Sequence, residues 1–226
     1  MSPKVLFIFS SAEKNLKGGP TGWFLPEAAH PYFVLKDKTD IDFAAPKGPN
    51  PPVDPYSVET TKEDALSVQF LNDETVKSKL ANAKTLSEIN IADYDAIFYP
   101  GGHGPMIDLA CDELNGKLAS QHYRAGKVTA AVCHGPGALV LATSADGKSI
   151  FAGRNVTGFT DAEEVAMNMV AAVPFLLEDR MKELGGEFSK ADLWGVKVVV
   201  DGNLITGQNP ASAAGVGEAI LKVLKL

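Results

Sequence analysis

The chain has 226 residues, of which 45% are hydrophobic, so it is long enough to bury a sizeable core as one domain. Its net charge of -7 argues against nucleic acid or an anionic membrane as the main partner, because either would repel it at long range. The apolar run near the start, Val5 to Phe9, is too short for a signal-peptide core or a membrane span, and two cysteines are too few for a disulfide framework. We therefore expect a cytoplasmic protein with reduced thiols and a small, neutral or weakly charged ligand.

Short apolar runs alternate with longer amphipathic segments through the first half of the chain. The predicted strands are Val5–Phe9, Ile41–Ala44, Ala96–Tyr99 and Val128–Val132. The predicted helices are Pro26–Lys36 in spite of Pro31, two within Lys62–Ala83, and Asp112–Arg124, which Gly126 closes. This rhythm predicts an α/β fold, with a mostly parallel central sheet and helices on both faces.

The second half of the chain continues the pattern with a short run at Val156–Gly158 and helical periodicity over Ala162–Met169 and Phe175–Leu184. The segment VVVDGNLITG predicts a hairpin, because Asp-Gly lies between two apolar runs, and PASAAGVGEAILKVLKL predicts a closing helix. The proline-rich segment Pro46–Ser57 is interpreted as a long loop, since the residues before it contain only two strands and could not bury a core alone. Residues 1–226 are therefore expected to form a single domain.

The segment AAVCHGPGALV places Cys133 and His134 between a predicted strand and a Gly-Pro-Gly run. Free cysteine is often simply buried, but a structural strand end needs neither the histidine nor the glycines. We interpret the segment as a nucleophile elbow, in which a strand, a sharp turn and a helix hold the thiol at the carboxyl edge of a sheet. The positive end of that helix and an adjacent imidazolium are expected to lower the thiol pKa below about 8.5.

The loop YPGGHGPMIDL follows the preceding predicted strand with an unusually bare backbone. The amide of Gly102 can share with the amide of His134 the stabilisation of a developing oxyanion. By itself the motif also fits a plain glycine turn that carries a surface histidine, His103.

Two carboxylates are candidates for partnering the thiol and the imidazole. Thr160 and Glu163 have the spacing of a capping box, which would commit Glu163 to a helix N-terminus and leave Glu164 freer to orient His134. A surface carboxylate in a first helical turn is an equally good interpretation of Glu164. Glu27 lies among apolar neighbours, where desolvation would raise its pKa, although its local sequence slightly favours a capping or exposed helix position.

No metal and no cofactor are expected from the motifs of this sequence. The four histidines show no zinc-ligand spacing. The glycine segments match neither the dinucleotide-binding nor the P-loop fingerprint.

Seven segments in order, running through nearly the whole chain, resemble the ThiJ/PfpI superfamily, which has the class I glutamine amidotransferase-like fold. Within it they resemble the chaperone and glyoxalase III-like branch; the segments are TGWFLPEAAHPYFVLKD, PPVDPYS, DYDAIFYPGGHGPMIDL, AAVCHGPGAL, VTGFTDAEE, VPFLLEDRM and VVVDGNLITGQNPASA. The resemblance implies a flavodoxin-like three-layer α/β/α sandwich with a mostly parallel central sheet and a nucleophile elbow. It also implies roles for five residues: Cys133 as nucleophile, His134 beside it, Glu27 near the thiol, Glu164 orienting the histidine, and Gly102 in the oxyanion loop. True amidotransferases use a late His-x-Glu pair that this sequence lacks, which argues against glutamine hydrolysis.

The activity implied by this branch is that of a glutathione-independent glyoxalase, a lyase of the D-lactate dehydratase type. It would convert a 2-oxoaldehyde, methylglyoxal, to lactate without a cofactor and so protect against reactive carbonyl stress. Either Glu27 or His134 would move the proton between the two carbons. The alternatives are a stress-response holdase chaperone or protein deglycase of the same superfamily and, ranked last, a cysteine peptidase. The family also makes a homodimer plausible.

Overall fold

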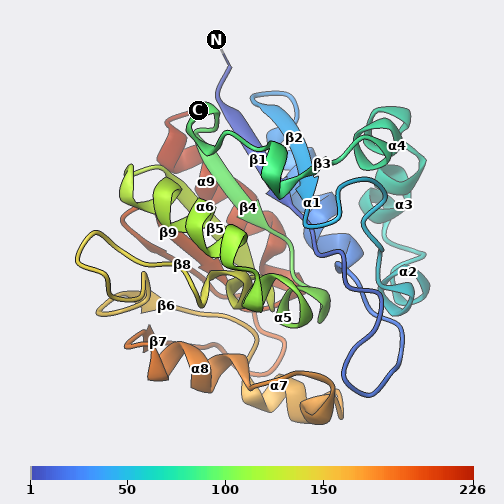
Figure 1. Cartoon of the computed structure of the whole chain (residues 1–226). Coiled ribbons are helices and arrows are strands. Elements are labelled where there is room, and N and C mark those ends of the chain that lie inside the picture. Colours follow the sequence, from blue (N-terminus) through green and yellow to red (C-terminus); the bar gives the residue numbers. More distant parts are fainter. Residues whose placement is uncertain (1) are drawn as a thin grey trace.

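A seven-stranded sheet forms the centre of the computed structural model, which describes residues 2–226 (Figure 1). Its strands are β1 (Lys4–Ile8), β2 (Asp40–Ala45), β3 (Lys84–Thr85), β4 (Ala96–Tyr99), β5 (Val128–Val132), β8 (Val198–Asp201) and β9 (Leu204–Gly207). Their order is β3-β2-β1-β4-β5-β9-β8, and every neighbouring pair is parallel except the β8–β9 hairpin. The predicted α/β fold with a mostly parallel sheet and a closing hairpin is confirmed.

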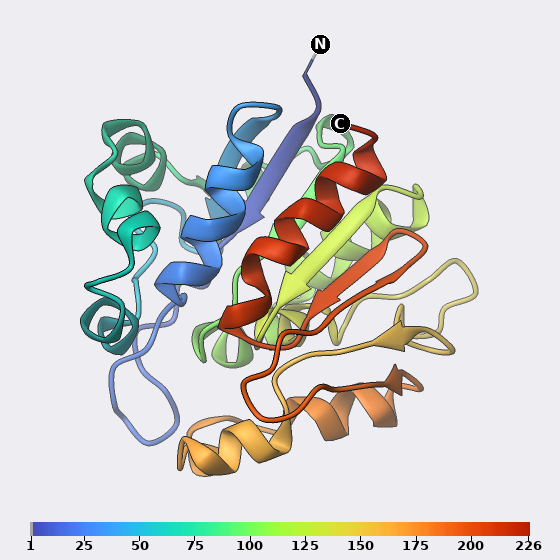
Figure 2. The same cartoon turned by 180° about the vertical axis from the view of Figure 1, so that it is seen from behind.

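Helices cover both faces of this sheet. Helices α1 (Leu25–Leu35) and α9 (Ala213–Leu224) lie side by side on one face (Figure 2), and α6 (Glu113–Arg124) lies on the other (Figure 1). The remaining α-helices are α2 (Pro55–Thr60), α3 (Ala65–Asn72), α4 (Glu74–Ala81), α5 (Gly104–Ile107), α7 (Asp161–Ala166) and α8 (Leu177–Glu183). The three-layer α/β/α arrangement agrees with the expectation.

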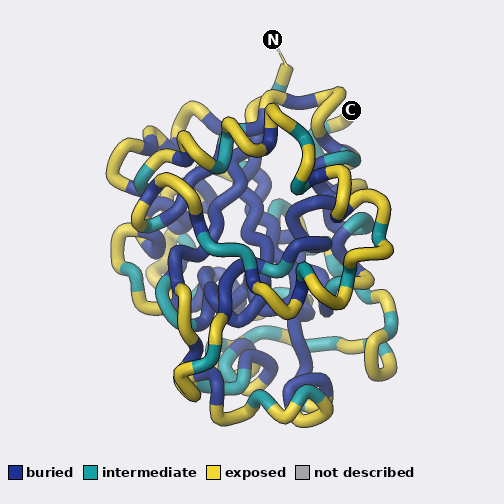
Figure 3. The backbone as a smooth tube through the Cα atoms, turned by 90° about the vertical axis from the view of Figure 1, so that its right-hand side faces the viewer, coloured by how far each residue is buried: buried dark blue, intermediate teal, exposed yellow. Residues whose placement is uncertain are grey.

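The core lies between the sheet and its two helical layers. Strand β1 is buried on both sides from Val5 to Ile8, as its continuous apolar run requires in a doubly covered parallel sheet. An aromatic cluster fills the layer toward α1, through contacts among Phe7, Phe9, Trp23, Tyr32, Phe43, Phe70 and Phe98. Figure 3 shows the buried backbone in the interior and exposed backbone around the outside. The strands whose carboxyl ends carry the candidate site are therefore held in place by a packed core.

Two helices within residues 62–83 are confirmed, since α3 and α4 are separate elements. Asp64 accepts a hydrogen bond from the backbone of Ser67, and Asp73 accepts from Thr75 and Val76, so each helix has its own N-cap. The closing helix and the helix with an internal Pro31 are also present.

Two predicted boundaries and one predicted helix differ from the structure, for local physical reasons. Helix α2 begins at Pro55, inside the predicted loop, because Asp54 caps it and proline suits a first helical turn. The predicted run at 156–158 forms only β6 (Asn155–Val156), which pairs with β7 (Glu187–Phe188) in a separate two-stranded sheet. The helix after Cys133 is a 3₁₀ helix of five residues, Gly135–Leu139, because Gly-Pro-Gly is a poor start for an α-helix.

Within residues 2–226, no helix has both the length and the apolarity needed to cross a bilayer.

Candidate active site

Cys133 follows the last residue of β5 in a left-handed backbone conformation, with φ of 59°. Its N–H donates to the carbonyl of Gly207 at 2.9 Å and its carbonyl accepts from the N–H of Phe159 at 2.8 Å, so two neighbouring segments hold this turn. A non-glycine residue in this region is strained by roughly 1–3 kcal/mol, a cost that is typical of functional turns. A Cβ at Gly135 would collide with the carbonyl of Tyr99, which explains that glycine. The turn has the strand–turn–helix geometry expected of a nucleophile elbow, although the helix after it is short.

The Cys133 thiol is buried, with Sγ 3.4 Å from Nδ1 of His134. Burial raises the pKa of the thiol well above its usual value, and the nearby carboxyl of Glu27 raises it further. The backbone amides of Gly102 and His134 interact with the sulfur and oppose part of this shift. The predicted lowering of the thiol pKa was therefore wrong, because the helix is too short to supply a strong dipole and desolvation dominates.

Glu27 reaches the same place from the first turn of α1 and is completely buried. Its Oε2 accepts a hydrogen bond of 2.7 Å from the amide of Gly101, while Oε1 is buried and makes no hydrogen bond of ordinary geometry with the described residues. Burial raises the pKa of Glu27 to about 8, and its interactions with Cys133 and with the Gly101 amide offset only part of that effect. Glu27 therefore holds a proton at neutral pH, beside the thiol.

Glu164 lies on α7 and joins two imidazoles. Its Oε2 lies 2.6 Å from Nε2 of His134, and its Oε1 lies 2.7 Å from Nε2 of His103. All three side chains are at most 8% exposed, and the two imidazole rings are 4.3 Å apart. The interpretation of Glu164 as a surface carboxylate was wrong, and so was that of His103 as a surface histidine. The sequence signal for His103 was its position in the glycine-rich loop of the neighbouring strand.

The charges in this cluster determine the histidine tautomers. Burial opposes ionisation of Glu164, but the two histidines outweigh burial and hold the pKa of this carboxyl well below its usual range. Burial, followed by the neighbouring His103, lowers the pKa of His134, although Glu164 opposes the shift. An ionised carboxylate only accepts hydrogen bonds, so Nε2 of each imidazole carries the proton. In neutral His134, Nδ1 is then an unprotonated acceptor that faces the sulfur.

The expected capping box at the start of α7 is confirmed, and it leaves the side chain of Glu164 oriented toward the two histidines. Thr160 and Glu163 exchange the two reciprocal hydrogen bonds of that motif. Oε1 of Glu163 also accepts from the side-chain amides of Gln208 and Asn209. Because Glu163 is fully committed to these partners, Glu164 is left to face the histidines.

A pocket of about 250 Å³ opens above the sulfur. Its lining is mostly apolar with a few polar groups, and comprises Phe24, Asp54, Tyr56, Thr60, Gly102, His103, Cys133, His134, Phe159, Met167, Trp194 and Pro210. Glu27 and Glu164 do not line it. Pockets for drug-sized ligands are roughly 300–1,000 Å³, so this one suits a smaller molecule.

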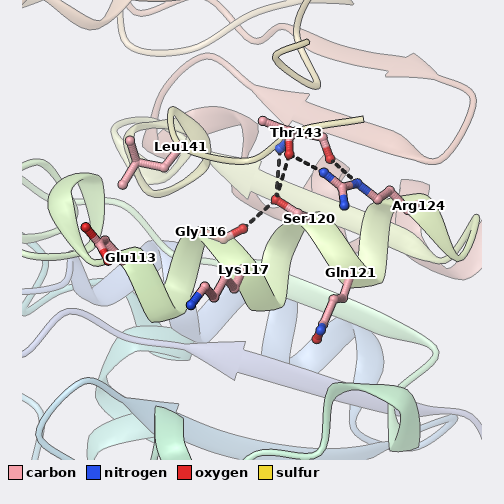
Figure 4. Close-up of a pocket in the computed structure, with 8 residues that line it drawn as sticks. All are labelled: Glu113, Gly116, Lys117, Ser120, Gln121, Arg124, Leu141 and Thr143. Atoms are coloured by element: carbon pink, nitrogen blue, oxygen red, sulfur yellow. Dashed lines mark hydrogen bonds between the residues drawn. The ribbon is translucent and has the colours of Figure 1, made fainter. Parts of the chain in front are cut away.

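A second hollow, of about 520 Å³, lies along α6 and is shown in Figure 4. Ser120 and Arg124 hydrogen-bond Thr143 across it, while Lys117 and Gln121 point away from Thr143. Its lining contains no cysteine, histidine or buried carboxylate. The larger hollow therefore lacks the reactive groups that surround the thiol.

His103, His134 and Glu164 are also a group that could reach one metal ion, since their donor atoms lie within 4.8 Å of one another. The sequence motifs did not indicate this group, because its members come from three separate segments. The three side chains already satisfy one another, and an ion would have to replace both of their hydrogen bonds. We therefore interpret Glu164 as the hydrogen-bond partner of His103 and His134, and not as a metal ligand.

Comparison with known proteins adds an independent line of evidence. The model of the DJ-1/PfpI family matches residues 53–223. The chain is 31% identical to the glutathione-independent glyoxalase HSP31 of Saccharomyces cerevisiae, with both chains covered completely. Two solved structures are similar: the rapid encystment protein of Francisella tularensis, with a TM-score of 0.93 at 35% identity, and glyoxalase III of Candida albicans, with 0.87 at 27%. The matches cover 98% of this chain in both cases, and 99% and 97% of the respective neighbours.

Proposed function

Because the chain belongs to the DJ-1/PfpI family, we propose that it is a glutathione-independent glyoxalase that converts methylglyoxal to lactate. The observation that supports this proposal most directly is the position of the Cys133 thiol. It lines a small pocket, and its Sγ lies 3.4 Å from Nδ1 of His134. The yeast relative named as a glutathione-independent glyoxalase supports the substrate class. The proposed enzyme is a cofactor-independent lyase.

The first step is addition of the sulfur to the aldehyde carbon, C1. Since the thiol is protonated at neutral pH, its proton must leave as the C–S bond forms, and Nδ1 of His134 is placed to take it. The carbonyl π electrons move to the aldehyde oxygen, which becomes an oxyanion. The amides of Gly102 and His134, which oppose part of the rise in the thiol pKa, are close enough to the sulfur to stabilise that charge.

The hydrogen of C1 must then reach C2 through an enediolate, which leaves a thioester of lactate on Cys133. Water gives its hydroxyl to C1 and its proton to the sulfur, so that lactate leaves and the thiol is restored. Glu27, which is protonated at neutral pH, donates a hydrogen bond to the sulfur while the sulfur carries negative charge.

Two alternatives remain as proposals of lower rank. The exposed apolar side chains of Leu193, Trp194 and Val196 favour a holdase activity as a second function, because such a surface can bind unfolded clients. A cysteine peptidase would need an open groove, and the pocket above Cys133 is small. A homodimer and a cytoplasmic location stay predictions.

The test is lactate formation by purified protein from methylglyoxal without glutathione. We expect activity from the wild type and none from Cys133→Ala, whereas Glu27→Gln should be impaired. A wild type that makes no lactate would overturn the proposal. Suppression of client aggregation by Cys133→Ala would show that a holdase activity is independent of the thiol.

A further inference from the structure

We propose that His103 is a second catalytic base, the group that carries the proton from C1 to C2 of the bound substrate. This inference rests on the proposed glyoxalase function and assigns the proton transfer that the mechanism above requires. It depends on how one carboxylate, Glu164, is shared between two imidazoles that both line the same pocket.

The first argument is the orientation of the His103 ring. Its Nε2 is 2.7 Å from Oε1 of Glu164, and this carboxylate is ionised, so Nε2 carries the proton. When the ring holds a single proton on Nε2, Nδ1 is an unprotonated acceptor. No hydrogen bond joins this Nδ1 to any residue that the structure describes, and Nδ1 is not among the fully buried atoms that lack a partner. Since His103 lines the pocket, this nitrogen is free to meet a ligand there.

The second argument is that His134 and Glu27 are committed elsewhere. Nδ1 of His134 already faces the sulfur of Cys133. Glu27 does not line the pocket and is protonated at neutral pH. Asp54 also lines the pocket; its Oδ1 accepts from the backbone of Tyr56 as the N-cap of α2, and its Oδ2 makes no hydrogen bond of ordinary geometry with the described residues. Of the two imidazoles in the lining, His103 is the one with an uncommitted acceptor.

The transfer balances with these assignments. Nδ1 of His103 takes the hydrogen of C1 as a proton, and the C1–H electron pair forms the C1–C2 double bond. The C2 carbonyl oxygen takes the proton that His134 received from the thiol. The oxyanion at C1 then restores its carbonyl, and the electrons of the double bond take the proton back from His103 at C2. The product is the thioester of lactate, with both histidines neutral again.

The test separates this role from a merely structural one. In His103→Gln, the side-chain amide can still donate to Glu164, but the base facing the pocket is lost. We expect kcat for lactate to fall by roughly 10²–10⁴-fold, the usual contribution of a positioned acid or base. Formation of the covalent Cys133–methylglyoxal adduct, followed by intact-protein mass spectrometry, should continue, as should alkylation of Cys133 by iodoacetamide. The matched control is His30→Gln, which makes the same change at a partly exposed histidine paired with Asp64 and should leave kcat unchanged.

Each other outcome overturns the inference in a distinguishable way. If His103→Gln keeps kcat within about twofold of the wild type, another group moves the proton. If adduct formation falls in parallel with kcat, His103 acts only by holding Glu164 and His134. If the wild type itself makes no lactate, the proposed function fails, and the role of His103 fails with it.

Discussion

Oε2 of Glu164 lies 2.6 Å from Nε2 of His134, and both side chains are almost completely buried. This contact determines which nitrogen of His134 faces the thiol, and the other oxygen of the same carboxylate does the same for a second histidine. The tautomers of two imidazoles that line the pocket therefore depend on a residue that does not line it.

Glu164→Gln should disrupt both imidazoles at once. A glutamine can donate as well as accept, so it no longer enforces the tautomer with a free Nδ1. We expect kcat for lactate to fall by about 10²-fold or more and alkylation of Cys133 to slow, with little change in the midpoint of thermal unfolding. Glu113→Gln, at an exposed carboxylate on α6, is the control and should match the wild type. Unchanged alkylation in Glu164→Gln would contradict the assigned tautomer.

The raised pKa of Glu27 predicts a pH dependence of stability. Its folded-state pKa is about 8 against an ordinary 4.5, so the folded state retains a proton that the unfolded state has lost between these values. The stability of the wild type should therefore fall, relative to Glu27→Gln, as pH rises from about 4.5 to about 8, with each pKa unit worth at most about 1.4 kcal/mol. Urea unfolding of both proteins at the two ends of this range measures the difference. Parallel pH profiles would show that Glu27 is ionised in the folded protein.

Cys133 should be alkylated more slowly than an ordinary thiol at neutral pH in the absence of substrate. Because burial raises its pKa, the rate of iodoacetamide alkylation should continue to increase above pH of about 8.5, where an ordinary thiol is half ionised. Cys111 is exposed and would also react, so the measurement uses Cys111→Ser. A rate that reaches its plateau below neutral pH would show that the thiol is instead activated in the free protein.

Gly101→Ala should damage both the fold and the site. A Cβ at this position would lie 2.5 Å from Oε2 of Glu27 and 2.8 Å from the amide of His134. Overpacking of this kind costs about 1–3 kcal/mol, and the displaced groups are the ones that surround the thiol. We expect lower stability to urea together with strongly reduced lactate formation.

Gly19→Ala is the control for this substitution, since its nearest new contact would be an ordinary 3.4 Å from a side-chain atom of Asn15. It should change stability by no more than about 0.5 kcal/mol. Equal behaviour of the two alanine variants would contradict the tight approach of Gly101 to Glu27.

Local sequence patterns predicted the regular elements well because those elements depend on local chemistry. The apolar run of β1, the Asp-Gly turn between β8 and β9, and the capping box of Thr160 and Glu163 each form where their residues indicate. The errors fell where a short stretch was ambiguous, as at Pro55, where a proline-rich loop also contained a helix cap.

The pKa of Cys133 shows the limit of such reasoning. Its neighbours in the chain, a histidine and a helix start, predict a lowered pKa. Its neighbours in space, a buried apolar wall and the carboxyl of Glu27, which is far away in the sequence, raise it. Desolvation depends on everything packed around the sulfur, and no local pattern contains that information.

By itself, the sequence determined the alternating α/β fold, the elbow at Cys133, and the candidacy of Glu27, His134, Glu164 and Gly102, because apolar periodicity and turn chemistry are local properties. Only the tertiary structure decided that Glu164 faces two histidines instead of solvent and that His103 is buried beside the thiol pocket. The physical reason is that parallel strands bring residues from β4, β5 and α7 to one edge of the sheet, and the distances between them are decided by packing across the whole domain.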